Sequence, residues 1–186
     1  GWKPGALLSP VPPALVTCGT LEAPNLLTIA WTGIVNTRPA MTYISVRPGR
    51  FSYPLIRQSG EFVLNLTTQE LVPAADFCGV RSGREVDKFA ACGLTPQAAS
   101  AVSAPLLAES PLSIECRVRQ VLELGSHHMF LADVVAVDVE ERLVDRQGKL
   151  HLERAGLAAY AHGAYFALGA PLGTFGFSVR KKPRRR

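Results

Sequence analysis

The residue types best suited to ligand chemistry lie in segment 45–52, which reads SVRPGRFS. Its first two residues end a predicted strand, Met41–Val46, and its last residue, Ser52, stands at the start of a predicted helix. It therefore places two guanidinium groups, those of Arg47 and Arg50, beside the positive end of a helix, where backbone N–H groups lack partners. Cations, a hydroxyl and free N–H groups together favour binding of a phosphate. The alternative is that both arginines are ordinary surface charges and that Ser52 only caps the helix.

The sequence contains none of the common short motifs for nucleotide binding or covalent catalysis. No GxGxxG follows a predicted strand, and the GxxxxGK[ST], GxSxG and HExxH patterns are absent. The four cysteines form no CxxC pair, so we expect free thiols and no zinc site or thioredoxin-type motif: Cys18, Cys78, Cys92 and Cys116. Nucleotide binding through those loops, a catalytic triad and a metal centre are therefore not expected.

The composition is that of a globular domain with a short basic tail. Of the 186 residues, 47% are hydrophobic and 19% are charged, which suffices for a sizeable core. The net charge of +5 arises from six positive residues within 180–186, because the other 14 basic residues are balanced by 15 acidic ones. We expect one domain at 1–179, a solvated tail at 180–186, no specific nucleic-acid binding and no membrane span. Free cysteines and a start without a secretory-signal pattern predict a cytoplasmic location.

Short runs rich in aliphatic, β-branched and aromatic residues predict strands separated by turns. They are Ala14–Cys18, Leu27–Trp31, Met41–Val46, Glu61–Leu66, Ser113–Arg119 and Met129–Glu140. The last two form a long hairpin, and strands of that length usually coil into a barrel wall. The second strand of the hairpin carries apolar residues on more than one face, which need a covering partner, so a homodimer is expected.

Helices are predicted to be few and short. Each is expected to have a hydroxyl residue as its N-cap and a glycine at its C-terminal end: 53–58 (Ser52, Gly60), 70–77 (Thr68, Gly79) and 84–91 (Ser82, Gly93). The Ala/Ser/Pro-rich segment 96–111 is expected to be a loop packed over the surface. Because helices do not alternate with strands, a doubly wound parallel sheet is disfavoured. The predicted fold is a mainly β, antiparallel β-barrel with a few short helices.

Five stretches in the same order resemble one known family. They are PVPPALVTC (10–18), NLLTIAWTGIVNTRPAMTYISVRPGRFSYP (25–54), VRSGREVDKF (80–89), ECRV (115–118) and GSHHMF (125–130). With them the chain resembles the flavin reductase-like, FMN-binding split-barrel family, and within it the flavoredoxin-like branch, from about Pro10 to Lys181. The resemblance implies a six-stranded split barrel, a homodimer, and FMN held near the dimer interface.

The resemblance also implies that the strand at 28–33 runs along the flavin. Four of its residues are small or carry a hydroxyl, which lets the backbone approach a flat ring: Thr28, Ala30, Thr32 and Gly33. Trp31 is expected either to form a wall for the ring or to pack in the core. The strand end and loop complete the phosphate side of the implied FMN site: Ser45, Val46, Arg47, Arg50 and Ser52.

Two further groups of residues follow from the resemblance. Asp87, Lys88 and Phe89 are implied to lie beside the flavin, with Lys88 facing the phosphate or ring edge and Phe89 closing the pocket. The alternative is an exposed Asp–Lys pair with Phe89 as a core residue. At the tip of the long hairpin, His128 is the candidate for substrate contact or proton supply; the alternative for His127 and His128 is ordinary solvation.

The resemblance implies an FMN-dependent oxidoreductase in which NAD(P)H or a redox protein reduces bound FMN. An alternative is a non-catalytic FMN-binding or electron-carrier protein without a nicotinamide site. A third possibility, a barrel that has lost its flavin pocket, is disfavoured by Arg50, Ser52 and Lys88. Segments 35–38 and 132–133 depart from the family's usual residues, so the partner or substrate is not implied. The pair Tyr165-Phe166 is expected to serve interface or core packing.

Overall fold

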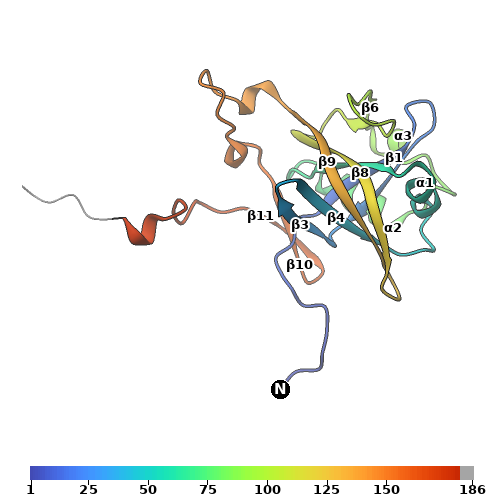
Figure 1. Cartoon of the computed structure of the whole chain (residues 1–186), viewed down its shortest axis with the longest axis horizontal. Helices are drawn as coiled ribbons and strands as arrows, with labels where there is room; N and C mark the ends of the chain where they lie inside the picture. Colours follow the sequence, from blue (N-terminus) through green and yellow to red (C-terminus); the bar gives the residue numbers. More distant parts are fainter. Residues whose placement is uncertain (181–186) are drawn as a thin grey trace, which may run out of the picture.

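The computed structural model describes residues 1–180 and is built on one curved antiparallel sheet (Figure 1). Residues 181–186, which hold most of the predicted basic tail, lie outside the described residues. The seven strands pair in the order β2-β1-β5-β8-β9-β4-β3. Their bounds are β1 Ala14–Gly19, β2 Pro24–Ile29, β3 Thr32–Thr37, β4 Ala40–Val46, β5 Glu61–Leu66, β8 Leu112–Glu123 and β9 His128–Val139. The predicted mainly β, antiparallel fold class is confirmed.

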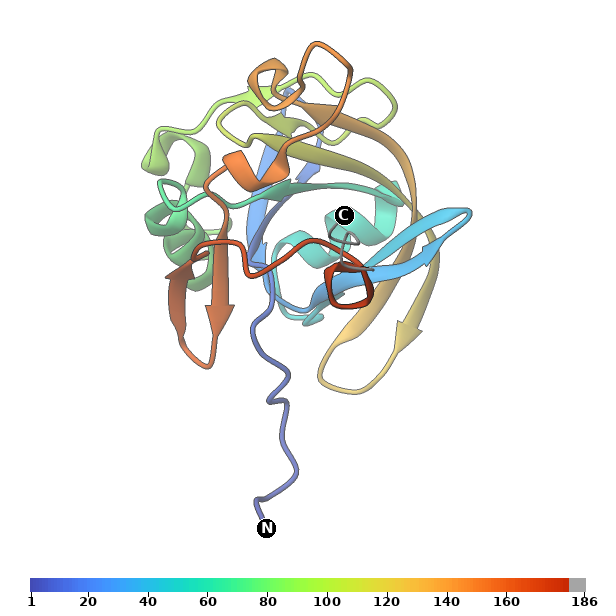
Figure 2. The ribbon, with the colours of Figure 1, turned by 90° about the vertical axis from the view of Figure 1, so that its left-hand side faces the viewer.

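The order of the strands explains why the sheet curls. Strands β2 and β3 occupy the two opposite edges of the sheet, yet only Ala30 and Trp31 separate them along the chain. Two residues cannot span seven strands, so the sheet must bend round until its edges approach each other. Figure 2 shows the resulting barrel-like wall. The short β2–β3 connection therefore lies where the two edges meet.

Three α-helices pack against this sheet: α1 Ser52–Ser59, α2 Val72–Val80 and α3 Lys88–Cys92. Helix α1 contributes Ile56 to the main core inside the barrel. Helices α2 and α3 instead cover the other face of β1 and β2, where a second core forms. Alternation along β1 serves both cores, because Val16 points into the barrel and Leu15 points toward α2 and α3.

The predicted helix starts need correction. Ser52 is the first residue of α1 and not its cap, because the N-cap position belongs to Phe51. Helix α2 begins at Val72, while the predicted cap Thr68 accepts a hydrogen bond from the Leu71 N–H, one turn earlier. Ser82 accepts from the Arg84 N–H in a turn and starts no helix.

The third helix is much shorter than predicted because a second capping residue lies downstream. The carboxylate of Asp87 accepts the Ala90 N–H, which starts α3 at Lys88. Gly93 ends the helix in the left-handed conformation, with a φ of 63°, as the sequence predicts. Residues 81–87 therefore form an irregular loop.

The long predicted hairpin is confirmed and reaches further than the sequence pattern indicates. Strands β8 and β9 each contain 12 residues and are paired from Leu112 opposite Val139 to Glu123 opposite His128. The register shifts after Glu115 and again after Val118. Such bulges bend a strand and increase its twist, which lets this hairpin wrap around the barrel (Figure 2).

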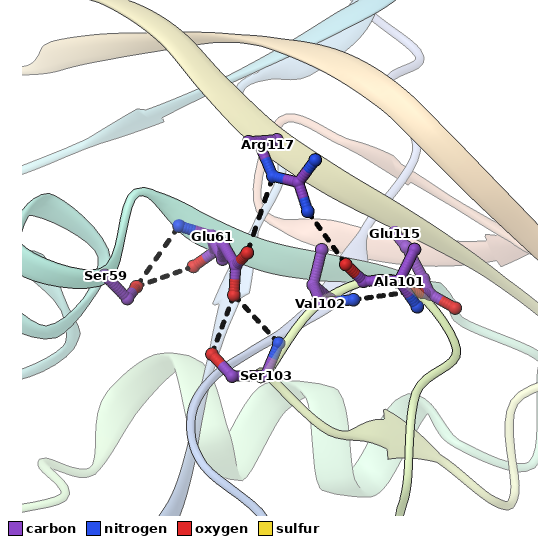
Figure 3. Close-up of polar contacts among 7 residues, drawn as sticks. All are labelled: Ser59, Glu61, Ala101, Val102, Ser103, Glu115 and Arg117. Atoms are coloured by element: carbon purple, nitrogen blue, oxygen red, sulfur yellow. Dashed lines mark hydrogen bonds and ion pairs between the residues drawn. The ribbon is translucent and has the colours of Figure 1, made fainter.

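Carboxylates hold segment 96–111 in place, and Figure 3 shows Glu115 beside Ala101 and Val102 and Glu61 beside Ser103. Glu115 is fully buried, and its two oxygens accept the N–H groups of Ser100, Ala101 and Val102 and the hydroxyl of Ser100. Burial alone would raise the pKa of Glu115, but these hydrogen bonds outweigh it and hold the pKa below its usual range. The segment contains one small sheet, formed by β6 Pro96–Gln97 and β7 Leu106–Leu107.

After β9 the chain returns to the edge of the barrel. It passes through two 3-10 turns, Glu141–Leu143 and Leu152–Arg154, into a hairpin of β10 Ala158–Ala161 and β11 Ala164–Ala167. A bridge between Val11 and Tyr160 ties this hairpin to the chain just before β1. Within residues 1–180, no helix is both long enough and apolar enough to cross a membrane.

Candidate functional site

A cleft of about 260 Å³ lies at the place where the sheet edges meet. Its walls come from β2 and the residues after it, the end of β4 with the following loop, helix α2, the tip of the β8–β9 hairpin and the β10–β11 hairpin. The lining residues are Pro13, Leu27, Thr28, Ile29, Ala30, Trp31, Ser45, Val46, Arg47, Arg50, Gly79, His127, Tyr160 and Tyr165. Elements from the whole length of the chain therefore build one site.

The floor of the cleft is the backbone around Thr28 and Trp31. Thr28 donates its hydroxyl to the Ala75 carbonyl of α2, and a Cβ at Gly79 would lie 3.4 Å from the Thr28 side chain. The Trp31 carbonyl accepts the Ser45 N–H at 2.9 Å, which ties the β2–β3 connection to the end of β4. These contacts bring α2 and β4 close to the edge strand β2. The small residues Ala30 and Gly79 leave the space above the strand open.

Two arginines provide the charge of the site. Arg47 and Arg50 follow β4 in a tight turn, with the Arg50 N–H donating to the Arg47 carbonyl at 3.0 Å, and α1 begins two residues later. Both residues are exposed, and the arginine ion pairs within residues 1–180 involve other side chains. The cleft therefore has a positive end whose guanidinium groups have no carboxylate partner in the described part of the chain.

His127 faces these arginines from the tip of the β8–β9 hairpin. Burial lowers its pKa, and the positive charges of Arg47 and Arg50 lower the pKa further. The Nδ1 atom lies 3.0 Å from the Ser126 hydroxyl. These effects favour the neutral imidazole, and a bound anion would make it more basic.

Two tyrosines of the β10–β11 hairpin also line the cleft. The rings of Tyr160 and Tyr165 meet edge to face with 5.3 Å between their centroids. Burial and the neighbouring Asp76 carboxylate raise the pKa of Tyr165. The Tyr165 phenol therefore stays protonated, and the two rings form an aromatic wall with hydroxyl groups.

The structure brings together one half of the residues predicted for the site. Seven of them line the cleft: Thr28, Ala30, Trp31, Ser45, Val46, Arg47 and Arg50. Thr32 and Gly33 lie just beyond it on β3. The Thr32 hydroxyl donates to the Tyr43 carbonyl, and a Cβ at Gly33 would lie 3.2 Å from the Tyr43 ring. Both residues therefore serve the pairing of β3 with β4.

Lys88 lies in the protein interior and does not line the cleft. Its side chain is 5% exposed, and Nζ donates to the Leu26 and Cys78 carbonyls at 2.8 Å each. Burial lowers the pKa of Lys88. The ammonium thus joins β2 to α2, Phe89 packs in the second core, and Asp87 caps α3. The arrangement is not an exposed Asp–Lys pair, although Phe89 is a core residue as in that alternative, and the predicted phosphate contact of Lys88 stays a prediction.

Ser52 and His128 also make contacts inside the protein. Ser52 is 2% exposed and accepts a hydrogen bond from the Asn25 side-chain amide at 2.6 Å. The Nδ1 atom of His128 lies 2.7 Å from the Tyr53 hydroxyl, and the two rings meet edge to face. His127, the preceding residue, is the histidine at the cleft. The cleft therefore adds His127 as a candidate, and the role predicted for His128 stays a prediction.

Sequence reasoning missed the contribution of the β10–β11 hairpin. Tyr165, interpreted as a packing residue, lines the cleft together with Tyr160. One signal could have found this hairpin: the dipeptide His162-Gly163 stands between two runs rich in alanine and aromatic residues. In the structure these two residues have positive φ angles of 46° and 92°, and Tyr160 pairs with Tyr165. An X-Gly pair of this kind is typical of a two-residue hairpin turn.

The cleft contains residues suited to an anionic organic ligand, while no group of three or more His, Cys, Asp or Glu side chains within residues 1–180 could hold a metal ion. A cation pair at one end fits a phosphate. Aromatic and small residues along the remaining walls fit a flat ring system.

Comparison with known proteins agrees with this site. The sequence model of the flavin reductase-like domain matches residues 7–169. The flavoredoxin of Desulfovibrio vulgaris (Miyazaki F) is 28% identical, with a TM-score of 0.89 over 97% of this chain and 98% of that one. An FMN-binding protein from Thermus thermophilus, solved with 1-cyclohex-2-enone, is 25% identical, with a TM-score of 0.74 over 92% and 99% of the two chains.

Among relatives compared by sequence, an uncharacterized protein of Aeropyrum pernix is 33% identical over 70% of this chain. The match spans 50% of that relative's length. The domain match covers most of the chain, and the similar structures are flavoredoxin and flavin reductase-like split barrels. The chain therefore belongs to the flavin reductase-like family and has its split-barrel fold.

Proposed function

We propose that this protein binds FMN in the cleft and acts as an oxidoreductase that passes electrons from NAD(P)H or a redox protein through the bound flavin. The observation that carries the proposal is the pair of unpartnered guanidinium groups, Arg47 and Arg50, at one end of a narrow cleft with aromatic walls. Family membership and the similarity to an FMN-binding protein support the same ligand.

The residues at the positive end fit the phosphate of FMN. Arg47 and Arg50 offer planar guanidinium groups, which bind phosphate oxygens through two parallel hydrogen bonds. Helix α1, eight residues long, begins two positions after Arg50, so the positive end of its dipole adds to the same field. Ser52 would support this end indirectly, through its hydrogen bond with Asn25.

The rest of the cleft fits the isoalloxazine ring. Strand β2 is an edge strand, so one side of its backbone is not used in the sheet and is available to polar atoms of the ring. Trp31, Tyr160 and Tyr165 provide aromatic surface, and Ala30 and Gly79 keep side chains out of the space. Flat apolar walls with a few backbone donors are what such a ring requires.

When bound, FMN supplies the redox chemistry, since it accepts electrons as a hydride or singly and releases them singly or in pairs. The chain's own residues bind and orient the cofactor. Arg47 and Arg50 hold its charged end, and the aromatic wall excludes water from part of its surface. The neutral imidazole of His127 is able to accept a proton beside the ligand. A nucleophilic side chain is not needed.

We also propose that the protein is a homodimer. On the edge strand β3, Ile34 is 85% exposed and Val35 is exposed, while Val135 and Val137 are exposed on β9. Apolar side chains of this kind on a strand edge and an adjoining sheet face favour a second copy as cover. Light scattering should return twice the chain mass of 20.0 kDa. A mass of one chain in the presence of FMN would contradict this.

The proposed function is tested by flavin content and by reduction. The purified protein, saturated with FMN and separated from excess, should carry about one FMN per chain. Anaerobic mixing with NADH or NADPH should then bleach the flavin absorbance. Failure to bind FMN would overturn the proposal. If FMN binds and dithionite reduces it but neither nucleotide does, NAD(P)H-dependent activity would be excluded. The electron-carrier alternative would then remain.

A further inference from the structure

Two thiols outside the cleft lie next to each other in the second core. The Sγ atoms of Cys78 in α2 and Cys92 in α3 are 4.0 Å apart, although 14 positions separate them along the chain. Cys78 is fully buried and Cys92 is partly exposed. The thiols therefore combine a protected sulfur with one that solvent can reach.

The surroundings favour reaction at Cys92. Lys88 and Cys92 are four residues apart on α3, so they share one face of the helix. The buried ammonium of Lys88 acts on the Cys78 thiol and favours its thiolate form. Burial and the neighbouring Cys92 nevertheless raise the pKa of Cys78 to about 12, so Cys78 stays protonated. A small oxidant would consequently meet the more accessible Cys92 first.

The local structure allows the two sulfurs to approach. A disulfide requires about 2.05 Å between them, so they must come closer by about 2 Å. Helix α3 is only five residues long, with the irregular loop 81–87 before it and Gly93 after it. Rotation of the Cys92 side chain together with a small shift of this short helix can supply the movement.

The other two cysteines have no such arrangement. Cys18 and Cys116 are each fully buried, and their sulfurs contact other groups: Cys18 accepts from the Asn25 amide and Cys116 donates to the Ile114 carbonyl. Burial raises the pKa of both thiols. They therefore serve as internal controls for chemistry at the pair.

We propose that Cys78 and Cys92 are a thiol oxidation site, which forms a reversible disulfide when the protein meets a hydroperoxide such as hydrogen peroxide. The Cys92 thiolate attacks one peroxide oxygen, the O–O bond breaks, and the other oxygen leaves as water after taking a proton. The Cys78 sulfur then attacks the resulting Cys92 sulfenic acid while its thiol proton passes to the departing hydroxyl, which forms the S–S bond and releases a second water. Two thiols and one peroxide thus give one disulfide and two waters, with two electrons passing from sulfur to oxygen.

The site would lie beside the ligand cleft. Cys78 precedes Gly79, whose backbone lines the cleft and packs against Thr28. A disulfide would join α3 covalently to this wall. The inference does not rest on the proposed function, because the oxidant is supplied from outside and the readout is the state of the thiols.

The experiment treats the folded protein with hydrogen peroxide, blocks remaining thiols in denaturant, and identifies peptides by mass spectrometry without reduction. The wild type should fall from four free thiols to two, with one cross-linked peptide that contains Cys78 and Cys92. Dithiothreitol should restore all four. Cys116→Ala should fall from three to one, whereas Cys92→Ser should retain all three of its thiols.

Circular dichroism before and after treatment establishes that each sample is folded, and Cys92→Ala replaces Cys92→Ser if the serine variant does not fold. Three results would overturn the inference. They are four thiols that survive in the folded wild type, oxidation of Cys92 to a sulfinic acid without a disulfide, and a cross-link to Cys18, to Cys116 or to another chain.

Discussion

The carboxylate of Glu115 and the guanidinium groups of Arg47 and Arg50 are charged groups in very different surroundings. Glu115 is fully buried and accepts four hydrogen bonds from the segment around Ser100. The two arginines are exposed at the cleft and have no side-chain partner among the described residues. A buried carboxylate that accepts hydrogen bonds from the protein around it stabilises the fold. Two neighbouring cations without protein partners are available to bind a ligand.

Lys88 shows why the distinction cannot be made from residue type. It is basic like the arginines, and it occurs in a motif that resembles part of a flavin site. Its ammonium is nevertheless buried and donates to two backbone carbonyls, which places it with Glu115. The contrast separates structural charges from ligand-binding charges, and the following variants test it.

Glu115→Ala should have the largest effect. It removes a buried acceptor from three backbone N–H groups and a hydroxyl, so the free energy of unfolding should fall by about 3–4 kcal/mol. Urea denaturation followed by circular dichroism measures the loss. Glu61→Ala is the matched control, because its carboxylate holds Ser103 of the same segment but is partly exposed, and it should lose about 1 kcal/mol. Equal losses for the two variants would contradict the assignment.

Lys88→Met should reduce stability without reducing flavin affinity. The substitution leaves the Leu26 and Cys78 carbonyls without a donor, and the free energy of unfolding should fall by about 2 kcal/mol. The dissociation constant for FMN, measured by fluorescence titration, should change by less than about threefold, a difference below 1 kcal/mol. Unchanged stability with a tenfold weaker FMN complex would show that Lys88 contacts the ligand instead.

Arg50→Ala should have the opposite pattern. Loss of one charge-assisted contact with the phosphate should weaken FMN binding by about 10- to 100-fold. Stability without ligand should change by less than about 0.5 kcal/mol, because the side chain is exposed. Arg146→Ala removes an exposed arginine away from the cleft and should leave FMN affinity unchanged. If both variants bind FMN like the wild type, the positive end of the cleft has no role in binding.

The smallest effect is expected at His127. Its pKa is lowered by burial and by Arg47 and Arg50, so the phosphate of FMN, by offsetting the positive charge, should raise it toward its ordinary value. Proton NMR of the histidine ring signals between pH 5 and 8, with His127→Gln for assignment, measures the shift. His151, held by Asp145 and Glu153 away from the cleft, should titrate identically with and without FMN. A His127 signal that does not respond to FMN would place the ligand elsewhere.

Local sequence patterns predicted six of the seven strands of the main sheet and the antiparallel class, because alternation and turn residues act over a few positions; strand β3, Thr32–Thr37, was missed. The positions of Lys88 and Tyr165 could not be predicted in this way. The position of the Lys88 ammonium depends on backbone carbonyls that lie 10 and 62 residues away in the sequence. Tyr165 lies at the cleft because the bridge between Val11 and Tyr160 ties its hairpin to the chain before β1. The start of α3 was missed because Ser82 and Asp87 are both good caps, and the fold uses Asp87.

The central claim is that the unpartnered guanidinium groups of Arg47 and Arg50 recognise the phosphate of a flavin. Calorimetric titration of the flavin-free wild-type protein with FMN and with riboflavin, which differ only in that phosphate, tests it most directly. We expect FMN to bind at least about tenfold more tightly than riboflavin, with most of the difference lost in Arg50→Ala. Equal affinities for the two flavins in the wild type would contradict the claim.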